Sequence, residues 1–95
     1  MSSKTFTGIT PDVWACIKAA SIKEHSTVYD PPAAEEGTAT TDTAVGKVVL
    51  QFVFDEDEST LVYTIQSKPF LVPESSLWSG VESSVEACGG VLAPS

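Results

Sequence analysis

Two neighbouring segments with an apolar residue at every second position constrain the fold of this chain more than any other feature. The first spans residues 46–55 and the second spans residues 61–66. A period of two predicts strands that place one apolar face on a core. A short acidic connection joins the segments, so the sequence predicts a β-hairpin over about residues 46–67. Its apolar face consists of Val48, Leu50, Phe52, Phe54, Leu61, Tyr63 and Ile65.

Two segments with helical spacing flank the hairpin. The first helix is predicted over about residues 11–22, because Thr10 is a good N-cap and Pro11 suits the first helical turn. The second helix is predicted over about residues 74–88, and the glycine pair that begins at Gly89 ends it. Apolar residues recur in both at the spacing of a helix with one buried face. In the second helix this stripe consists of Trp78, Val81, Val85 and Cys88.

This order of elements predicts an α+β fold. We expect an antiparallel sheet of two to four strands with both helices packed on one face. The length of 95 residues fits a single small domain over residues 1–95. Residues 30–44 carry no large apolar side chain and are predicted to form a mobile loop, with a weak edge strand near 38–43 as the alternative. Residues 91–95 are expected to form a loose tail.

The charge balance excludes several classes of partner. The 13 acidic residues oppose five basic residues, all lysines, and the formal net charge is −8 at pH 7. Nucleic acids and anionic membrane surfaces are bound by clustered cations, which this chain lacks. No apolar run approaches the roughly 20 residues of a membrane-spanning helix. We expect neither nucleic acid nor membrane as a partner, and because the N-terminus carries no secretory signal we expect a cytoplasmic protein.

The two cysteines, Cys16 and Cys88, are predicted to be reduced thiols on the apolar faces of the helices. Free cysteine is among the most buried residue types, and the wide separation of these two matches no metal-ligand spacing. The alternative is one long-range disulfide in an oxidising compartment. The missing secretory signal argues against that alternative.

No catalytic residue, metal ligand or cofactor is predicted. Residues 55–59 begin like a calcium-binding loop, but Thr60 stands in place of the turn glycine and Gln66 in place of the terminal glutamate. We therefore interpret this acidic run as a solvated hairpin tip. A nucleophile pair would need Cys16 and His25, and no third group is evident to orient them. The chain is thus expected not to be an enzyme.

These features predict a small acidic, non-catalytic interaction module. The sheet face turned away from the helices, here called the outer sheet face, carries valines where a solvated face is normally more polar. A second copy of the chain or another protein is the expected partner on this face. Its residues are Val49, Gln51, Val53, Val62, Thr64 and Gln66.

The alternative function is that of a carrier for a small apolar ligand held between the helices and the sheet. Aromatic side chains would line such a pocket, although a domain of this size has little volume to spare for a cavity. The candidate pocket residues are Trp14, Phe52, Phe54, Tyr63 and Trp78. Binding of a fluorescent ligand would separate this alternative from the interaction module.

Overall fold

Six antiparallel strands and two helices make up the computed structural model, which describes residues 2–31 and 35–93. The order of the strands across the sheet is β2-β3-β4-β5-β1-β6. The helices are α1 (Pro11–His25) and α2 (Glu74–Ala87). The strands are β1 (Ser3–Thr7), β2 (Val28–Asp30), β3 (Glu36–Thr43), β4 (Gly46–Asp55), β5 (Thr60–Ser67) and β6 (Val91–Leu92).

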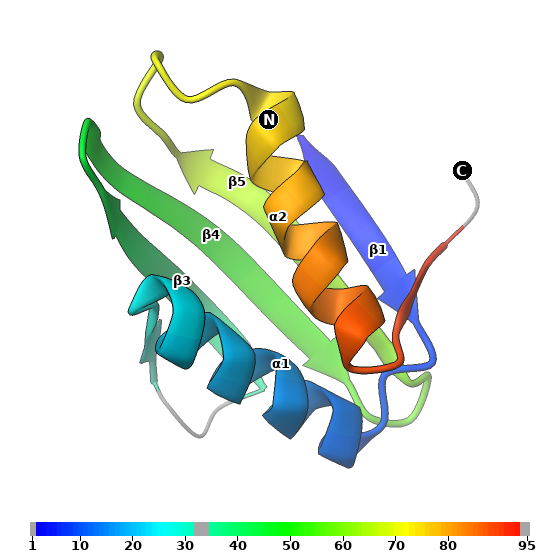
Figure 1. Cartoon of the computed structure of the whole chain (residues 1–95). Coiled ribbons are helices and arrows are strands. Elements are labelled where there is room, and N and C mark those ends of the chain that lie inside the picture. The colour runs from blue at the N-terminus through cyan, green and yellow to red at the C-terminus, as the bar shows by residue number, and fades with distance from the viewer. Residues whose placement is uncertain (1, 32–34, 94–95) are drawn as a thin grey trace.

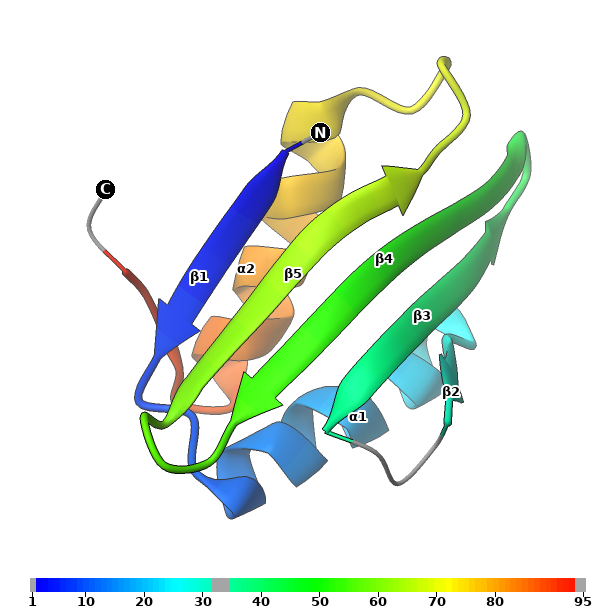
Figure 2. The same cartoon turned by 180° about the vertical axis from the view of Figure 1, so that it is seen from behind.

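The two helices lie on one side of the sheet and leave its other side uncovered. Figure 1 shows α1 and α2 in front of the strands, and Figure 2 shows the bare sheet from behind. Buried residues alternate along β4 and β5, which pair as the antiparallel hairpin that the sequence predicts. Their inward side chains join those of the helices in one hydrophobic cluster, which includes Phe6, Ile17, Phe52, Leu61 and Val85.

The predicted sheet of two to four strands is too small. β1 pairs with β5 from Ser3↔Thr64 to Phe6↔Leu61, so the second strand of the hairpin is not at an edge. β2 and β6 add one short strand at either edge of the sheet. These three strands have five, three and two residues. Segments this short have too few positions for a clear period, so only their pairing partners reveal them.

The mobile loop predicted over residues 30–44 is wrong for its second half, which forms β3. This strand pairs with β2 on one side and with β4 on the other, so it is not an edge strand either. Its threonines favour extended backbone. The prediction failed because it required large apolar side chains, whereas β3 has small ones facing inward: Gly37, Ala39 and Thr41, opposite Phe52, Leu50 and Val48. Residues 32–34 lie outside the described residues.

Local capping sets the ends of the helices. The Thr10 hydroxyl accepts a hydrogen bond from the Val13 backbone N–H at 3.2 Å, as predicted for the start of α1. The helix continues past its predicted end at residue 22 until Ser26, which adopts a left-handed conformation with φ of 54°. α2 has its predicted bounds, except that Cys88 is its C-cap. Within the described part of the chain, no helix is long and apolar enough to cross a lipid bilayer.

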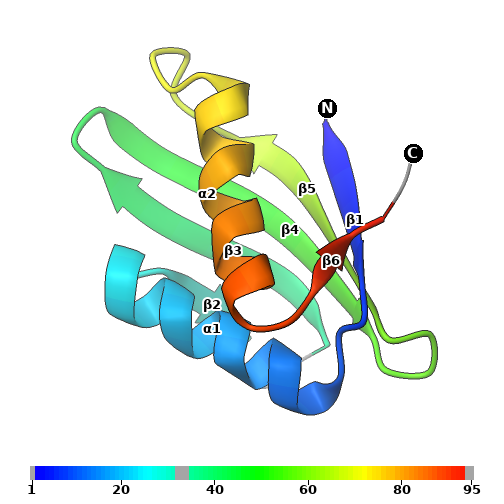
Figure 3. The same cartoon turned by 45° about the vertical axis from the view of Figure 1, so that its right-hand side comes forward.

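The C-terminal segment, predicted as a loose tail, begins with a strand. Val91 and Leu92 form β6 and pair with Thr7 and Phe6 of β1. Figure 3 shows β6 between the end of α2 and β1. Gly89, with φ of 102°, allows the chain to turn from the helix into this strand. The last part of the predicted tail, residues 94–95, lies outside the described residues.

Cys16 and Cys88 form a disulfide, so the prediction of two reduced thiols is wrong. The bond joins α1 to the C-cap of α2, with 5.8 Å between the two Cα atoms. Cys16 is exposed and Cys88 is half-buried, so neither is the fully buried core residue that the helical stripes predicted. The two residues are 72 positions apart in sequence. Only the packing of the helices brings them together, and no local pattern encodes that packing.

Candidate ligand-binding cavity

A cavity of about 240 Å³ lies between the two helices and the inner face of the sheet. We call it the interhelical cavity. Its interior is formed by buried side chains from α1, α2 and the strands, and its rim is formed by the exposed residues His25, Thr43, Ser76 and Gly80. The cavity therefore opens where the C-terminal end of α1, the end of β3 and the first half of α2 approach one another. The interior walls include Ile17, Tyr29, Leu50, Tyr63, Leu77 and Val85.

The walls of the interhelical cavity are largely apolar. α2 contributes Leu77, Val81 and Val85, and the sheet contributes Val48 and Leu50. These side chains belong to the hydrophobic cluster or pack against it, so the cavity is an open recess that reaches from the surface into the core. Such a recess favours a ligand with an apolar surface, because binding removes that surface and the walls from water.

Small side chains explain why this part of the core is open. On β3, Ala39 and Thr41 line the cavity where a central strand usually presents larger residues. On α2, Gly80 lies at the cavity rim, and a Cβ atom added there would have no atom within 4 Å. Glycine inside a helix costs about 1 kcal/mol relative to alanine. The chain thus carries a destabilising residue at a place where alanine would fit and would narrow the opening.

A pair of tyrosine hydroxyls forms the main polar feature of the interior. The hydroxyl oxygens of Tyr29 and Tyr63 are 3.1 Å apart and hydrogen-bonded, and both residues are buried. Burial raises the pKa of Tyr29, and it raises the pKa of Tyr63 well above its usual value, where the neighbouring Tyr29 adds to the rise. Both phenols therefore stay protonated and uncharged throughout the physiological pH range.

Further hydroxyl groups lie on the same side of the cavity. The Thr27 and Thr41 hydroxyls are hydrogen-bonded at 2.7 Å, and the Ser21 hydroxyl donates to the Ile17 carbonyl at 2.9 Å. Among the described lining residues there is no aspartate, glutamate or lysine, and His25 at the exposed rim is the single side chain able to carry a positive charge. The interior is therefore largely apolar, carries several hydroxyl groups and has no charged side chain among the described residues.

The five residues predicted to line a pocket fall into three groups. Tyr63 lines the interhelical cavity. Trp14, Phe52 and Phe54 instead pack on one another, with ring centroids 5.3 and 5.7 Å from Trp14, and fill the space beside the cavity. Trp78 is buried over β1, where its indole N–H donates to the Ser2 hydroxyl at 3.0 Å and the Lys4 ammonium lies 5.8 Å from its ring centroid. The structure thus brings only one of the five to the cavity.

The six residues of the outer sheet face lie on β4 and β5. Val53 is opposite Val62, and Gln51 is opposite Thr64. Val53 is 39% exposed and is the most exposed large apolar side chain of the six. The Thr64 hydroxyl is hydrogen-bonded to that of Ser3 on β1 at 2.8 Å. Hydroxyl and amide groups therefore divide the valines of this face, which reduces its apolar character.

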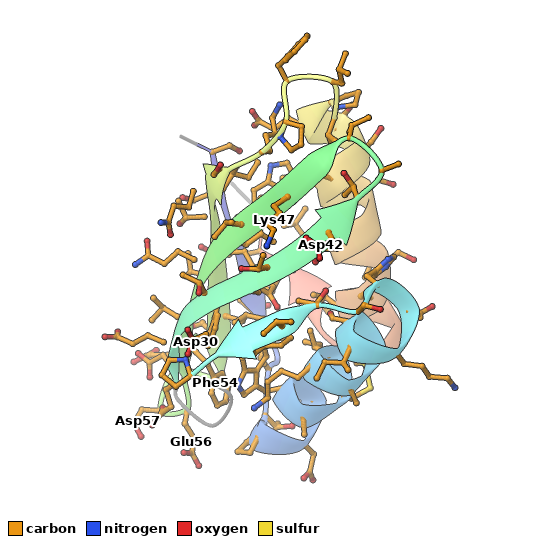
Figure 4. All side chains as sticks on the ribbon, turned by 90° about the vertical axis from the view of Figure 1, so that its left-hand side faces the viewer. Asp30, Asp42, Lys47, Phe54, Glu56 and Asp57 are labelled. Carbon is orange, nitrogen blue, oxygen red and sulfur yellow. A yellow bond between two sulfur atoms is a disulfide. The ribbon has the colours of Figure 1, made fainter. Side chains whose placement is uncertain are left out.

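The acidic tip of the hairpin is solvated. Residues 55–58 are exposed, and Asp55 accepts a hydrogen bond from the Glu58 backbone N–H at 3.2 Å. Figure 4 shows Glu56 and Asp57 at one end of the sheet, far from Asp42 and Lys47, whose charged groups are 3.8 Å apart. Within residues 2–31 and 35–93 there is no group of three or more histidine, cysteine, aspartate or glutamate side chains placed to hold a metal ion. Cys16 is disulfide-bonded and offers no thiol to His25.

Sequence analysis missed most residues of the interhelical cavity. Ser21, Thr27, Thr41 and Gly80 are small or polar, and each is unremarkable in its own segment. One signal was available, because Gly80 lies inside the second helix without ending it. The open space beside this glycine becomes visible only when the helix is packed on the sheet.

Comparisons of this chain with protein-family models, with curated proteins and with solved structures return no match. The chemistry of the described residues is therefore what points to a function.

Proposed function

We propose that this protein binds a small apolar ligand in the interhelical cavity and acts as its carrier. The observation that carries the proposal is a cavity of about 240 Å³ with largely apolar walls in a chain of 95 residues. A domain of this size has a small core, and unfilled volume lowers its stability. Binding of a ligand would regain that lost packing.

Gly80 supports a binding role for the cavity. A methyl group at this position meets open space, so replacing the glycine would fill volume without a clash and would strengthen α2. Glycine at this rim position therefore costs helix stability without being required by a close contact. This is the pattern expected where function opposes stability.

A fluorescence titration tests the proposal. The probe is N-phenyl-1-naphthylamine, an uncharged molecule whose emission rises in apolar surroundings. We expect saturable binding to the unaltered protein and at least tenfold weaker binding to Gly80→Leu, whose side chain would occupy the cavity. Ser83→Leu is the matched control, because Ser83 is exposed on α2 and does not line the cavity. Equal binding by all three proteins would overturn the proposal.

The disulfide bears on where the protein works. Disulfides persist in oxidising compartments and are rare in the cytoplasm. Cys16 is exposed, so cytoplasmic reductants would reach the bond. We therefore favour an oxidising compartment over the cytoplasm expected from the sequence. Location of a tagged protein, together with the redox state of its cysteines in cells, is the corresponding measurement.

Self-association through the outer sheet face is a second candidate function. The supporting observation is the exposed Val53 beside Val62 on a sheet face that no helix covers. The proposed partner is a second copy of the chain. Light scattering at rising concentration is the test, with Val53→Lys expected to lower the apparent mass. A concentration-independent monomer would exclude this candidate and leave the carrier function untouched.

A further inference from the structure

We propose that the ligand is an uncharged molecule, apolar over most of its surface, with a single hydroxyl or carbonyl group that hydrogen-bonds to the Tyr29–Tyr63 pair. This inference rests on the proposed carrier function and names the class of ligand that the same cavity accepts. Three properties of the interhelical cavity lead to it: its charge, its hydroxyl groups and its size.

The charge of the walls excludes an anionic ligand. A carboxylate moved from water into an apolar interior needs a cation or several donors, and otherwise costs several kcal/mol. No lysine lines the cavity among the described residues. The Lys68 ammonium lies behind the lining residue Val72, where it donates to the Val72 carbonyl at 2.8 Å, and Lys68 itself does not line the cavity. His25 stands at the exposed rim, where water screens its interactions.

An ammonium ligand is excluded by the same reasoning with the signs reversed. The chain carries 13 acidic residues, yet none of those in the described segments lines the interhelical cavity. Its interior hydroxyls are neutral, because burial keeps both tyrosines protonated. A buried cation would therefore lose its hydration without gaining a carboxylate partner. An uncharged ligand is the remaining class.

The tyrosine pair provides the polar contact. Two phenol groups carry two protons, and their mutual hydrogen bond uses one of them, with either oxygen able to be the donor. If Tyr29 donates, the Tyr63 proton is left for a ligand acceptor such as a carbonyl. If Tyr63 donates, the Tyr63 oxygen is left to accept from a ligand hydroxyl. In both arrangements one hydrogen-bonding position remains at the cavity wall.

The size of the cavity limits the apolar part of the ligand. An apolar cavity of about 150 Å³ can bind benzene, and the interhelical cavity of about 240 Å³ is larger. It is smaller than the roughly 300–1,000 Å³ of pockets that take drug-sized molecules. A compact body of two fused rings, or an aliphatic body of similar volume, matches this space, and a further ring such as the phenyl group of the probe would extend through the open rim.

Three naphthalene derivatives of nearly equal size test the inference by displacement of N-phenyl-1-naphthylamine. They are 2-acetylnaphthalene, with an uncharged carbonyl, 2-ethylnaphthalene, with no polar group, and 2-naphthoate, an anion. We expect the ketone to bind about three- to tenfold more tightly than the hydrocarbon, which corresponds to one net hydrogen bond. We expect the anion to bind at least about 100-fold more weakly than the ketone, because its charge is uncompensated.

Two variants place the polar contact. Tyr63→Phe keeps the ring and removes the hydroxyl that is left for the ligand, so we expect it to abolish the preference for the ketone while the hydrocarbon affinity changes less than about twofold. Tyr29→Phe removes only the partner of that hydroxyl and should keep the preference. Thr40→Val is the control, because Thr40 lies on the outer side of β3 and does not line the cavity. It should keep the full preference. The ratio of two affinities on one protein remains interpretable even if a variant is less stable.

The outcomes distinguish the two levels of the proposal. If the probe itself does not bind saturably, the carrier function fails. If the probe binds and none of the three compounds displaces it, the carrier function stands and the inferred ligand class is wrong. If the hydrocarbon and the ketone bind equally to the unaltered protein, or if the anion binds as tightly as the ketone, the carrier function stands and the inferred ligand class is wrong. A ketone preference that survives in Tyr63→Phe would show that the polar contact lies elsewhere.

Discussion

The space between the helices and the sheet has two halves that differ in what fills them. In one half, Trp14 packs against Phe52 and Phe54. The ring centroids of these two residues lie 5.3 and 5.7 Å from that of Trp14, so aromatic side chains fill this half. In the other half, Ala39 and Gly80 replace large side chains, and a cavity of about 240 Å³ remains. The same two layers thus form a close-packed core at one end and a binding recess at the other.

The two halves show that the largest side chains set the distance between the helices and the sheet. A cavity remains where the side chains are too small to fill that distance. The aromatic cluster around Trp14 holds α1 off the sheet, and the disulfide at Cys16 ties α1 to α2. Beyond these supports the helices stay apart. Small residues there cannot draw them together, because closing the gap would break the packing of the aromatic half.

The largest effect should come from removing the aromatic support. Trp14→Ala deletes a buried side chain that contacts four other aromatic rings, and we expect a loss of about 3–5 kcal/mol in the free energy of unfolding. A domain of this size has about 5–10 kcal/mol in total. The melting temperature should fall by more than about 12 °C. Thermal melts followed by circular dichroism measure it.

Leu77→Ala is the matched variant in the open half. Leu77 is half-buried and lines the cavity, so part of its surface has no packing partner to lose. We expect less than half of the destabilisation caused by Trp14→Ala. Equal losses in the two halves would mean that the recess is as well packed as the aromatic half, and the comparison would be wrong.

The next largest effect concerns the disulfide that joins the helices. Cross-linking residues 72 positions apart is expected to stabilise the fold by about 2–4 kcal/mol, mainly by restricting the unfolded chain. The double variant Cys16→Ser, Cys88→Ser should lose this amount, as should the unaltered protein in a reductant such as TCEP. Thermal melts with and without TCEP measure the loss. Reductant should leave the melting temperature of the double variant unchanged. If a thiol reagent labels Cys16 or Cys88 in the folded protein without reductant, the disulfide is contradicted.

Two glycines, one beside open space and one in filled space, offer a smaller effect of opposite sign. Gly80→Ala should raise the free energy of unfolding by about 0.5–1 kcal/mol, because alanine favours the helix and meets open space. Gly90→Ala should lower it by about 1–3 kcal/mol, because the added Cβ would lie 2.5 Å from side-chain atoms of Ile9 and Val85. Urea titrations of both variants test this. The same sign for both would disprove the assignment of open and filled space.

The smallest effect on stability at neutral pH comes from the tyrosine pair. Its contribution to the free energy of unfolding should change only at alkaline pH. The pKa values of Tyr29 and Tyr63 are raised in the folded state. The folded protein therefore holds these two phenol protons more tightly than the unfolded chain does. Their contribution to stability is complete below pH 10 and is lost as the pH rises above it. These are the two tyrosines of the chain, so absorbance at 295 nm reports them alone.

That absorbance should stay constant past pH 10 and rise together with unfolding. In 6 M guanidinium chloride, both tyrosines should instead titrate near pH 10, their ordinary value. A phenolate signal from the folded protein at pH 10 would mean that the pair is open to water. The polar side of the interhelical cavity would then be hydrated rather than buried.

Much of the architecture follows from local pattern. Alternation in residues 46–66 predicts the hairpin, and Thr10 with Pro11 predicts the start of α1, because each signal lies within a few residues of the element it specifies. β3 was predicted only as a weak edge strand and as the alternative to a mobile loop, because its small inward residues carry no periodic signal of their own. β1 and β6 escaped prediction because short strands are defined by the neighbours with which they pair.

By itself, the sequence determined the α+β class, the hairpin, the two helices and the acidic, lysine-only charge balance. The tertiary structure alone decided three things: that Cys16 meets Cys88, that Trp14 fills one half of the core, and that Tyr29 and Tyr63 share a hydrogen bond beside an open recess. The reason is physical. Secondary structure depends on residues close in the chain, whereas a disulfide, a packed ring or a cavity depends on the distance between elements, which all the side chains between them set together.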